Sequence, residues 1–174
     1  MLTRRAALIA SAAALPWGAA RAQTPPGIAV MAKQIDDVIS FDPAESYEFT
    51  DNEVDGNCYR KLIVPDLANA TRIAPDLAEH WEVSPDNTTF TFHLTKNARF
   101  ESGKPVTAVD AEFSLRRIVQ LNKTPAFIIT QFGFTKDNVE RLIRATDEST
   151  LVLQLPAPQA PSFVLYCLSA NVGC

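Results

Sequence analysis

Strict alternation of hydrophobic and polar side chains marks residues 89–95 (TFTFHLT). This two-residue period is typical of a β-strand with one buried face, and the residues expected to point inward are Phe90, Phe92 and Leu94. Trp81 and Val83 share one face of the extended segment before it, and residues 84–87 (SPDN) have the composition of a tight turn. The pattern therefore predicts a β-hairpin, with Trp81 in the core and His93 on the solvated face. The alternatives are a binding role for the Trp81 ring and a ligand role for His93.

A helical pattern follows a second expected turn at residues 101–105 (ESGKP). Thr107 is a good N-cap, and Asp110 three residues later completes a capping-box pattern. Apolar residues then recur at helical spacing: Ala108, Ala111, Leu115, Ile118 and Val119. We expect Arg116 and Arg117, near the end of this helix, to lie on its solvated side and to interact favourably with the helix dipole, with anion binding as the alternative.

Weaker patterns describe the chain before the hairpin. A short apolar run at residues 28–31 fits a buried strand, and residues 36–49 are expected to form a loop. A helix is predicted over residues 53–64, and Pro65 would end it. Its apolar side would consist of Val54, Cys58, Leu62 and Ile63.

The chain after the capped helix shows two further patterns. Residues 139–145 and 151–155 predict a second hairpin, in which the inward-facing residues are Leu151, Leu153 and Leu155. Three prolines then separate this hairpin from an apolar helix expected from residue 162 to residue 168. Strands and helices thus occur together, which indicates an α/β class of fold.

The first residues have the three-part pattern of a cleaved export signal. Arg4 and Arg5 precede an apolar run at residues 6–15, and Ala20-Arg21-Ala22 places small residues before a cleavage point. We therefore expect residues 1–22 to be a signal peptide cleaved after Ala22, and residues 23–174 to work outside the cytoplasm. The arginine pair leaves both the general secretory route and the twin-arginine route open.

Composition and charge exclude several classes of protein. The 174 residues include 47% hydrophobic and 21% charged residues, which is ordinary for a globular protein. The net charge of -4 argues against a general nucleic-acid binder, which usually has a basic face. No apolar run reaches the roughly 18–20 residues that a membrane-spanning helix needs.

Motifs for catalysis or metal binding are missing from the sequence. It contains no G-x-S-x-G, H-E-x-x-H or C-x-x-C, and neither His80 nor His93 has a metal-ligand spacing with any cysteine. We therefore expect no metal, no cofactor and no enzymatic activity, with an exported hydrolase as a remote alternative. The odd number of cysteines leaves the disulfide pairing of Cys58, Cys167 and Cys174 open.

One long segment carries a pattern of fixed spacing. Residues 74–117 (APDLAEHWEVSPDNTTFTFHLTKNARFESGKPVTAVDAEFSLRR) contain P-x-L-A-x-x-W, then T-F-x-L, then A-x-F-x-x-G-x-P-x-T-A-x-D followed by F-S. This segment resembles the family 5 extracellular solute-binding proteins, the peptide, dipeptide and nickel class that serves ABC transporters. The matching residues are Pro75, Leu77, Ala78, Trp81, Thr91, Phe92, Leu94, Ala98, Phe100, Gly103, Pro105, Thr107, Ala108, Asp110, Phe113 and Ser114.

The resemblance extends upstream, with two departures. Phe41-Asp42-Pro43 stands where the family has an L-D-P element. Thr95-Lys96 departs from the family because a basic residue usually follows the leucine directly. Residues 58–62 (CYRKL) depart from the aromatic-Glu-Gly-Leu of many members, which leaves the local pocket wall open.

The resemblance implies a fold and a function. Residues 23–174 would form the N-terminal portion of the family domain, an incomplete part of lobe I of a periplasmic-binding-protein fold of type II, class C. The implied function is that of a periplasmic, monomeric substrate-binding component for oligopeptide or dipeptide uptake, partnered by an ABC transporter permease in the inner membrane. The family also includes binders of nickel chelates, haem, opines and sugars, and this segment does not separate them.

The resemblance also points to ligand contacts. In peptide-binding members the loop after the L-D-P element reaches the cleft, and the stretch after the capped helix approaches it. In this chain the corresponding residues are Tyr47, Glu48 and Phe49 in the loop and Phe127, Gln131 and Phe132 in the later stretch. The alternative role for the aromatic residues among them is packing in the core.

Overall fold

The computed structural model describes residues 24–174, so the expected signal peptide at residues 1–22 lies outside the described part. Two units are distinguished, one up to Gln34 and one from Ile35 to Cys174. The described part of the first unit contains no helix or strand, and the prediction of a buried strand at residues 28–31 is wrong. Ile28, Val30 and Met31 are all more than half exposed. A run of four apolar residues is too short to define a strand without a pairing partner, and no described strand pairs with it.

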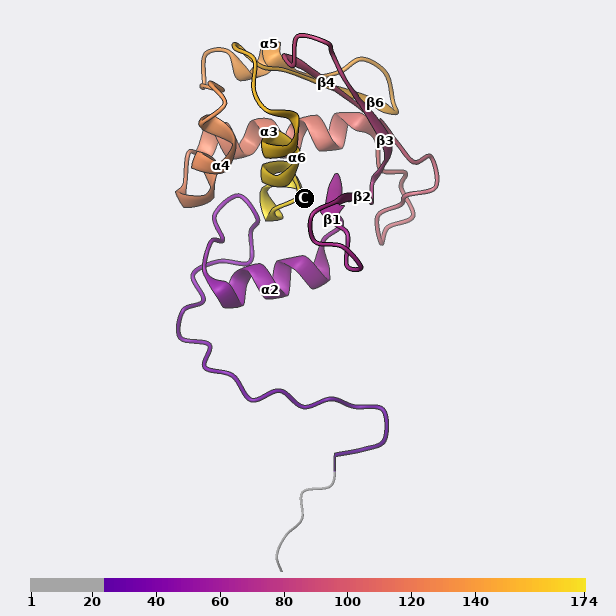
Figure 1. The fold of residues 1–174 in the computed structure, drawn as a ribbon. Coiled ribbons are helices and arrows are strands. Elements are labelled where there is room, and N and C mark those ends of the chain that lie inside the picture. Colours follow the sequence, from indigo (N-terminus) through magenta and orange to yellow (C-terminus); the bar gives the residue numbers. More distant parts are fainter. Residues whose placement is uncertain (1–23) are drawn as a thin grey trace, which may run out of the picture. The chain divides into compact units, whose positions relative to one another are not determined.

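The second unit contains two antiparallel sheets and several helices (Figure 1). Strands β1 (Ile63–Pro65) and β2 (Ile73–Pro75) form a two-stranded sheet, and the four-stranded sheet has the order β3-β4-β6-β5. Its strands are β3 (Ala78–Val83), β4 (Thr89–Leu94), β5 (Ile143–Ala145) and β6 (Thr150–Gln154). The helical segments are α2 (Phe49–Cys58), α3 (Ala108–Leu121), η1 (Thr124–Ala126), α4 (Phe127–Thr130), α5 (Val139–Leu142), α6 (Pro161–Leu168) and η2 (Asn171–Gly173). None of the helices described is long and apolar enough to cross a membrane.

The first predicted hairpin is confirmed as β3 and β4. Their register pairs Trp81 with Phe92 and Val83 with Phe90, so the apolar side chains of the two strands share one face. Phe90 and Phe92 are fully buried, and Trp81 packs against the same core. His93 lies on the opposite, partly exposed face, as the alternation predicts.

The second predicted hairpin is also present, but its first strand is shorter. Strand β5 begins only at Ile143, because the preceding residues 139–142 form the helical turn α5. Strand β6 lies between β4 and β5, and Leu151 and Leu153 pair with Phe92 and Phe90 across the sheet. The core is therefore built from central strands that are distant in sequence.

Helix α3 covers one side of this sheet (Figure 1). The predicted capping box is confirmed, since the Thr107 backbone N–H donates to the Asp110 carboxylate over 2.8 Å. The buried stripe of the helix is formed by Ala108, Leu115, Ile118 and Val119. The helix ends at Asn122, which adopts a left-handed conformation.

The prediction for the two arginines of α3 is wrong. Arg116 forms an ion pair with Glu112 and donates to the Ile143 carbonyl over 2.9 Å, so it links the helix to β5. Arg117 forms an ion pair with Asp42, far upstream in the chain. Helical spacing alone could not show these partners, because they come from other segments.

The predicted helix at residues 53–64 is displaced towards the N-terminus. Helix α2 spans Phe49–Cys58, and residues 63–65 form strand β1 instead. The buried side of α2 is polar and consists of Thr50, Asp51 and Asp55, whereas Cys58 is exposed. The apolar Leu62 and Ile63 are buried because they lie in and beside a strand, not because they continue a helical face.

Candidate functional site

The loop that carries Tyr47, Glu48 and Phe49 begins at a fixed point, Asp42. The Asp42 carboxylate accepts hydrogen bonds from both terminal nitrogens of Arg117, over 2.7 and 2.5 Å, and a third from the Ala44 backbone N–H over 3.0 Å. The hydrogen bond from Arg117 holds the pKa of Asp42 below its ordinary value. A bidentate contact of this kind fixes orientation as well as distance, so it holds the start of the loop against helix α3.

Carboxylates also fix the far end of the loop. Asp51 and Asp55, on helix α2, are both fully buried. Asp51 accepts hydrogen bonds from the Ile39 backbone N–H, and Asp55 accepts one from the buried Ser46 hydroxyl. Burial raises the pKa of Asp55 despite the opposing effect of this hydrogen bond. The loop is therefore attached at both ends through buried or half-buried carboxylates.

The structure brings the two predicted ligand-contacting segments together. The rings of Tyr47 and Phe127 meet edge to face, with centroids 5.5 Å apart and an interplanar angle of 75°. Both rings remain about half exposed, at 43% for Tyr47 and 51% for Phe127. An aromatic pair in contact yet open to solvent can offer ring faces to a bound molecule.

A small hollow of about 180 Å³ lies beside this pair. Ser46 and Tyr47 line it from the loop, and Pro125 and Ile128 line it from the stretch after α3. Asn171 closes it from the C-terminal segment, where its side-chain N–H donates to the Asn52 backbone and side-chain oxygens over 2.9 Å. Three segments distant in sequence thus form one surface, which we call the Tyr47–Phe127 surface.

The other four predicted residues lie differently. Phe49 is 89% exposed at the start of α2, and Glu48 occupies the N-cap position of that helix. Gln131 is exposed and donates to the Ile128 carbonyl over 2.9 Å. Phe132 is only 4% exposed and packs edge to face against Phe163, so it lies in the core beneath this surface.

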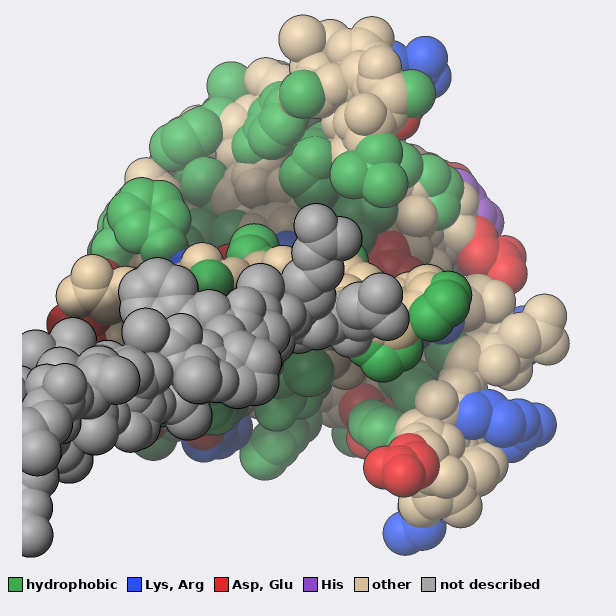
Figure 2. Space-filling view, turned by 90° about the horizontal axis from the view of Figure 1, so that it is seen from below, with side chains coloured by type: hydrophobic (Ala, Val, Ile, Leu, Met, Phe, Trp, Pro, Cys, Tyr) green, Lys and Arg blue, Asp and Glu red, His purple; other side chains and the backbone are tan. Residues whose placement is uncertain are grey.

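A larger cavity, which sequence reasoning did not identify, has the Asp42–Arg117 pair in its lining. Its volume is about 670 Å³, within the range of roughly 300–1,000 Å³ that is typical of ligand pockets. Exposed aromatic residues line it: Phe41, Tyr59, Phe100 and Phe113. Hydrophobic side chains are also exposed elsewhere on the face drawn in Figure 2. Isolated aromatic residues in a sequence gave no signal for this cavity, because the four rings come from separate segments of the chain.

The cysteines contribute no bridge to either hollow. Among the described residues, Cys58, Cys167 and Cys174 are all free thiols. Cys58 and Cys174 line the larger cavity, and burial raises the pKa of Cys174 to about 12. A thiol with so high a pKa is not a nucleophile at neutral pH.

Comparison with known proteins assigns this architecture. Residues 72–172 match the family described as bacterial extracellular solute-binding proteins, family 5 Middle. The chain is 32% identical over 172 residues to the probable D,D-dipeptide-binding periplasmic protein DdpA of Escherichia coli K12, which covers 97% of this chain and 31% of the relative. Other similar relatives are named as oligopeptide-, dipeptide- or di/tripeptide-binding proteins. The chain spans between 14% and 32% of the length of the first curated relatives that it matches.

Solved structures give the same result. The crystal structure of Haemophilus influenzae OppA in complex with the peptide RPPGFSPFR superposes with a TM-score of 0.66 and 27% identity, over 76% of this chain and 27% of that protein. The binding protein AgaA of Agrobacterium tumefaciens R10, in complex with agropinic acid, superposes with a TM-score of 0.62 and 28% identity, over 77% and 25%. The described fold is thus a mixed α/β part of a periplasmic binding-protein structure, as the sequence predicts.

Proposed function

The chain belongs to the bacterial extracellular solute-binding proteins of family 5, and on that premise we propose that it is part of a receptor for oligopeptides or dipeptides. The observation that carries this proposal is the family match over residues 72–172, together with relatives that are consistently named for peptide binding. A family of solute-binding proteins agrees with the expectation of a binding protein rather than an enzyme. The receptor would hand its ligand to an ABC transporter permease in the inner membrane.

Location and domain organisation form part of the same proposal. Several relatives are periplasmic by name, which supports a periplasmic place of action. We assign residues 1–22 to an export signal cleaved after Ala22 and residues 23–174 to the N-terminal portion of the family domain. In such a receptor a second lobe would close over the ligand, and closure would supply much of the affinity.

The Tyr47–Phe127 surface is our candidate for the ligand-facing part of this portion. The half-exposed rings of Tyr47 and Phe127 would contact apolar side chains of a peptide. The Gln131 amide and the Glu48 carboxylate would offer hydrogen bonds to its polar groups. Phe49 would extend the apolar contact, and buried Phe132 would support the surface from below. Aromatic residues next to a few polar groups are typical of small-molecule sites.

Ligand-induced stabilisation tests this function directly. The protein, expressed with any sequence that its gene adds after codon 174, is heated with a panel of di-, tri- and longer peptides. The control ligands are an opine, a nickel chelate, haem and a sugar. A peptide at 100 times its Kd would stabilise the protein by about 2.7 kcal/mol through mass action. Stabilisation by one of the control ligands and by no peptide would replace the peptide proposal with that ligand class.

A pair of matched variants tests the surface. Phe127→Ala removes a half-exposed ring from the Tyr47–Phe127 surface, and Phe113→Ala removes a ring that is 66% exposed at the larger cavity. Both changes delete exposed aromatic area, so their effects on folding should be similar. We expect weaker peptide affinity in Phe127→Ala alone. Loss of affinity only in Phe113→Ala would move the candidate site to the larger cavity.

A further inference from the structure

The only two histidines of the chain lie opposite each other on neighbouring strands. His80 on β3 and His93 on β4 are register partners, and their rings stack with centroids 4.3 Å apart and an interplanar angle of 15°. Thirteen positions separate them in sequence, which is why no motif revealed the pair. The hairpin alone brings the two imidazoles together.

A β-bulge is responsible for this arrangement. The register pairs Ala78 with Leu94 and then His80 with His93, so β3 has one extra residue, Glu79, at this point. Ala78 is buried, and in a regular strand the residue two positions later would face the same side. The bulge instead turns His80 to the outer face of the sheet, where His93 already lies. Bulges are known to redirect a side chain in this way, often beside functional sites.

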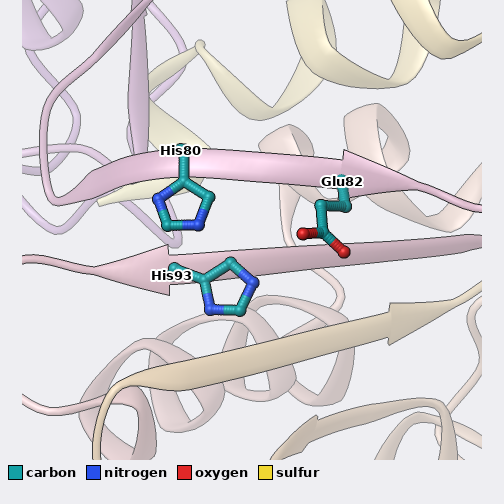
Figure 3. A group of neighbouring side chains, drawn as sticks. All are labelled: His80, Glu82 and His93. Atoms are coloured by element: carbon teal, nitrogen blue, oxygen red, sulfur yellow. The ribbon is translucent and has the colours of Figure 1, made fainter.

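Glu82 completes a group of three. It follows His80 by two positions on β3 and so shares the outer face, as Figure 3 shows. One ring nitrogen from each histidine and one carboxylate oxygen of Glu82 all lie within 4.8 Å of one another. His80 and Glu82 are exposed and His93 is partly buried, so the group is open to solvent. Figure 2 shows histidine at the molecular surface beside acidic side chains.

The Glu82 carboxylate has no basic partner in the part of the chain that the structure describes. Within its row across the sheet, Glu82 is followed by Thr91, Val152 and Arg144. Arg144 therefore lies three strands away, about 14 Å at the usual spacing between strands. At that distance in solvent, its charge hardly affects Glu82. Two imidazoles and one carboxylate without a counter-charge form a donor set for a cation.

From this group we propose a binding site for a divalent transition-metal ion of the zinc class, with His80, His93 and Glu82 as ligands. Two histidines and a glutamate are a known donor set for zinc, and water would fill the remaining position. Tetrahedral bonds of about 2.0–2.1 Å to zinc place ligand atoms roughly 3.3 Å apart. The present separations of up to 4.8 Å must therefore shorten, and one ring must turn out of the stack. Exposed side chains make such rotations at little cost.

The donor set also selects against other ions. Imidazole nitrogens suit zinc, copper and nickel, whereas magnesium and calcium prefer sites made of oxygen ligands alone. The site lies on the outer face of the sheet, opposite the face that packs on α3. It depends on neither the identity of the solute nor the Tyr47–Phe127 surface, so its failure would leave the proposed receptor function unaffected.

Zinc titration of the purified chain, prepared without a histidine tag, tests the proposal. We expect one Zn²⁺ per chain by calorimetry, and shifts of both histidine ring resonances in NMR spectra as Zn²⁺ is added. His80→Ala and His93→Ala should each weaken binding by at least about tenfold, because losing even an outer-shell partner typically costs 10–100-fold. Glu82→Gln, which keeps the side chain's size, should also weaken binding, and Mg²⁺ should not bind.

Two controls make the result decisive. Glu79→Gln removes an exposed carboxylate from the same strand but from outside the group, and should leave zinc affinity unchanged. Cys58→Ser removes the exposed thiol, which is the main competing soft ligand. The proposal is overturned if the chain binds no stoichiometric zinc, if binding survives both histidine variants, or if Cys58→Ser alone abolishes it. Circular dichroism of each variant separates loss of the site from loss of the fold.

Discussion

Removing the Arg117–Asp42 pair should loosen the loop that carries Tyr47. The pair joins α3 to the start of the loop through two hydrogen bonds of 2.7 and 2.5 Å. Arg117→Ala deletes both bonds. Arg117→Lys keeps the positive charge but replaces the planar fork with a single ammonium group, which cannot make the bidentate contact. Comparing the two variants separates geometry from charge.

The magnitude follows from the exposure of the pair. Hydrogen bonds to charged groups contribute about 1.5–3 kcal/mol when they are well shielded. Here the side chains are 36% and 34% exposed, and exposed ion pairs contribute only about 0.2–1 kcal/mol. We therefore expect Arg117→Ala to lower the free energy of unfolding by about 1 kcal/mol, and Arg117→Lys by roughly half of that. Either loss is small beside a typical total of about 5–15 kcal/mol.

The pH dependence gives the sharper test. Hydrogen bonding to Arg117 lowers the pKa of Asp42 in the folded state below the ordinary 3.8. A carboxyl group with a lowered folded pKa stabilises the protein fully above its unfolded pKa, and this contribution is lost as the pH falls through the folded value. The difference between the wild type and Arg117→Ala should therefore be complete at pH 7 and shrink below about pH 4.

Urea denaturation at pH 7 and at pH 3, followed by Trp81 fluorescence, measures this difference. Hydrogen exchange at the Ala44 and Ser46 amides, which bond to Asp42, reports on the loop itself. We expect faster exchange at both amides in Arg117→Ala. An equal loss of stability at both pH values, or unchanged exchange in the loop, would refute the idea that this ion pair positions the segment.

Three further outcomes are expected. Phe92→Ala should lower the free energy of unfolding by about 3–5 kcal/mol in urea titrations, because it opens a cavity at a fully buried position. A loss below 1 kcal/mol would mean that the sheet does not pack as described. Thr107→Ala should cost about 1 kcal/mol by the same measurement, since it removes the N-cap of α3, and Thr107→Ser should restore most of it. At pH 8 a maleimide should modify exposed Cys58 rapidly and Cys174 slowly, because burial raises the pKa of Cys174 to about 12. Equal rates by mass spectrometry would contradict that burial.

The sequence correctly predicted the structural elements that are specified by a few neighbouring residues. The alternation of residues 89–95 and the capping box at Thr107 each specify a structure within a few residues, and both are confirmed. The helix expected at residues 53–64 was wrong because its supposed apolar side mixed a helix with a strand. The inward face of α2 carries Asp51 and Asp55, whose partners Ile39 and Ser46 lie in the preceding loop. The spacing of hydrophobic residues cannot reveal a buried helix face that consists of hydrogen-bonded carboxylates.

For the candidate ligand surface, too, the sequence could not show which side chains are buried and which reach solvent. The family resemblance pointed to two segments that lie far apart in the chain, and the structure joins them at Tyr47 and Phe127. It could not show that Phe132 points inward while Phe127 remains exposed, because the stretch between them forms the short helix α4. A four-residue helix turns successive side chains to different sides. Only its packing decides which ring reaches solvent.

The histidine pair and the core depend on one and the same register. Phe92 and Leu94 are buried on the inner face while His93 between them faces outward, and a slip of one residue would exchange the two faces. The buried face therefore fixes His93 on the outer side with the full strength of core packing. His80 has no such constraint from alternation alone, since buried Ala78 would direct it inward. The bulge at Glu79 resolves this conflict, because it takes up the one extra residue and lets Ala78 pair with Leu94 while His80 pairs with His93; deleting Glu79 should therefore give a regular strand that keeps the two rings opposite each other. The proposed metal site thus depends on the register of the hairpin, which the bulge preserves despite the extra residue in β3.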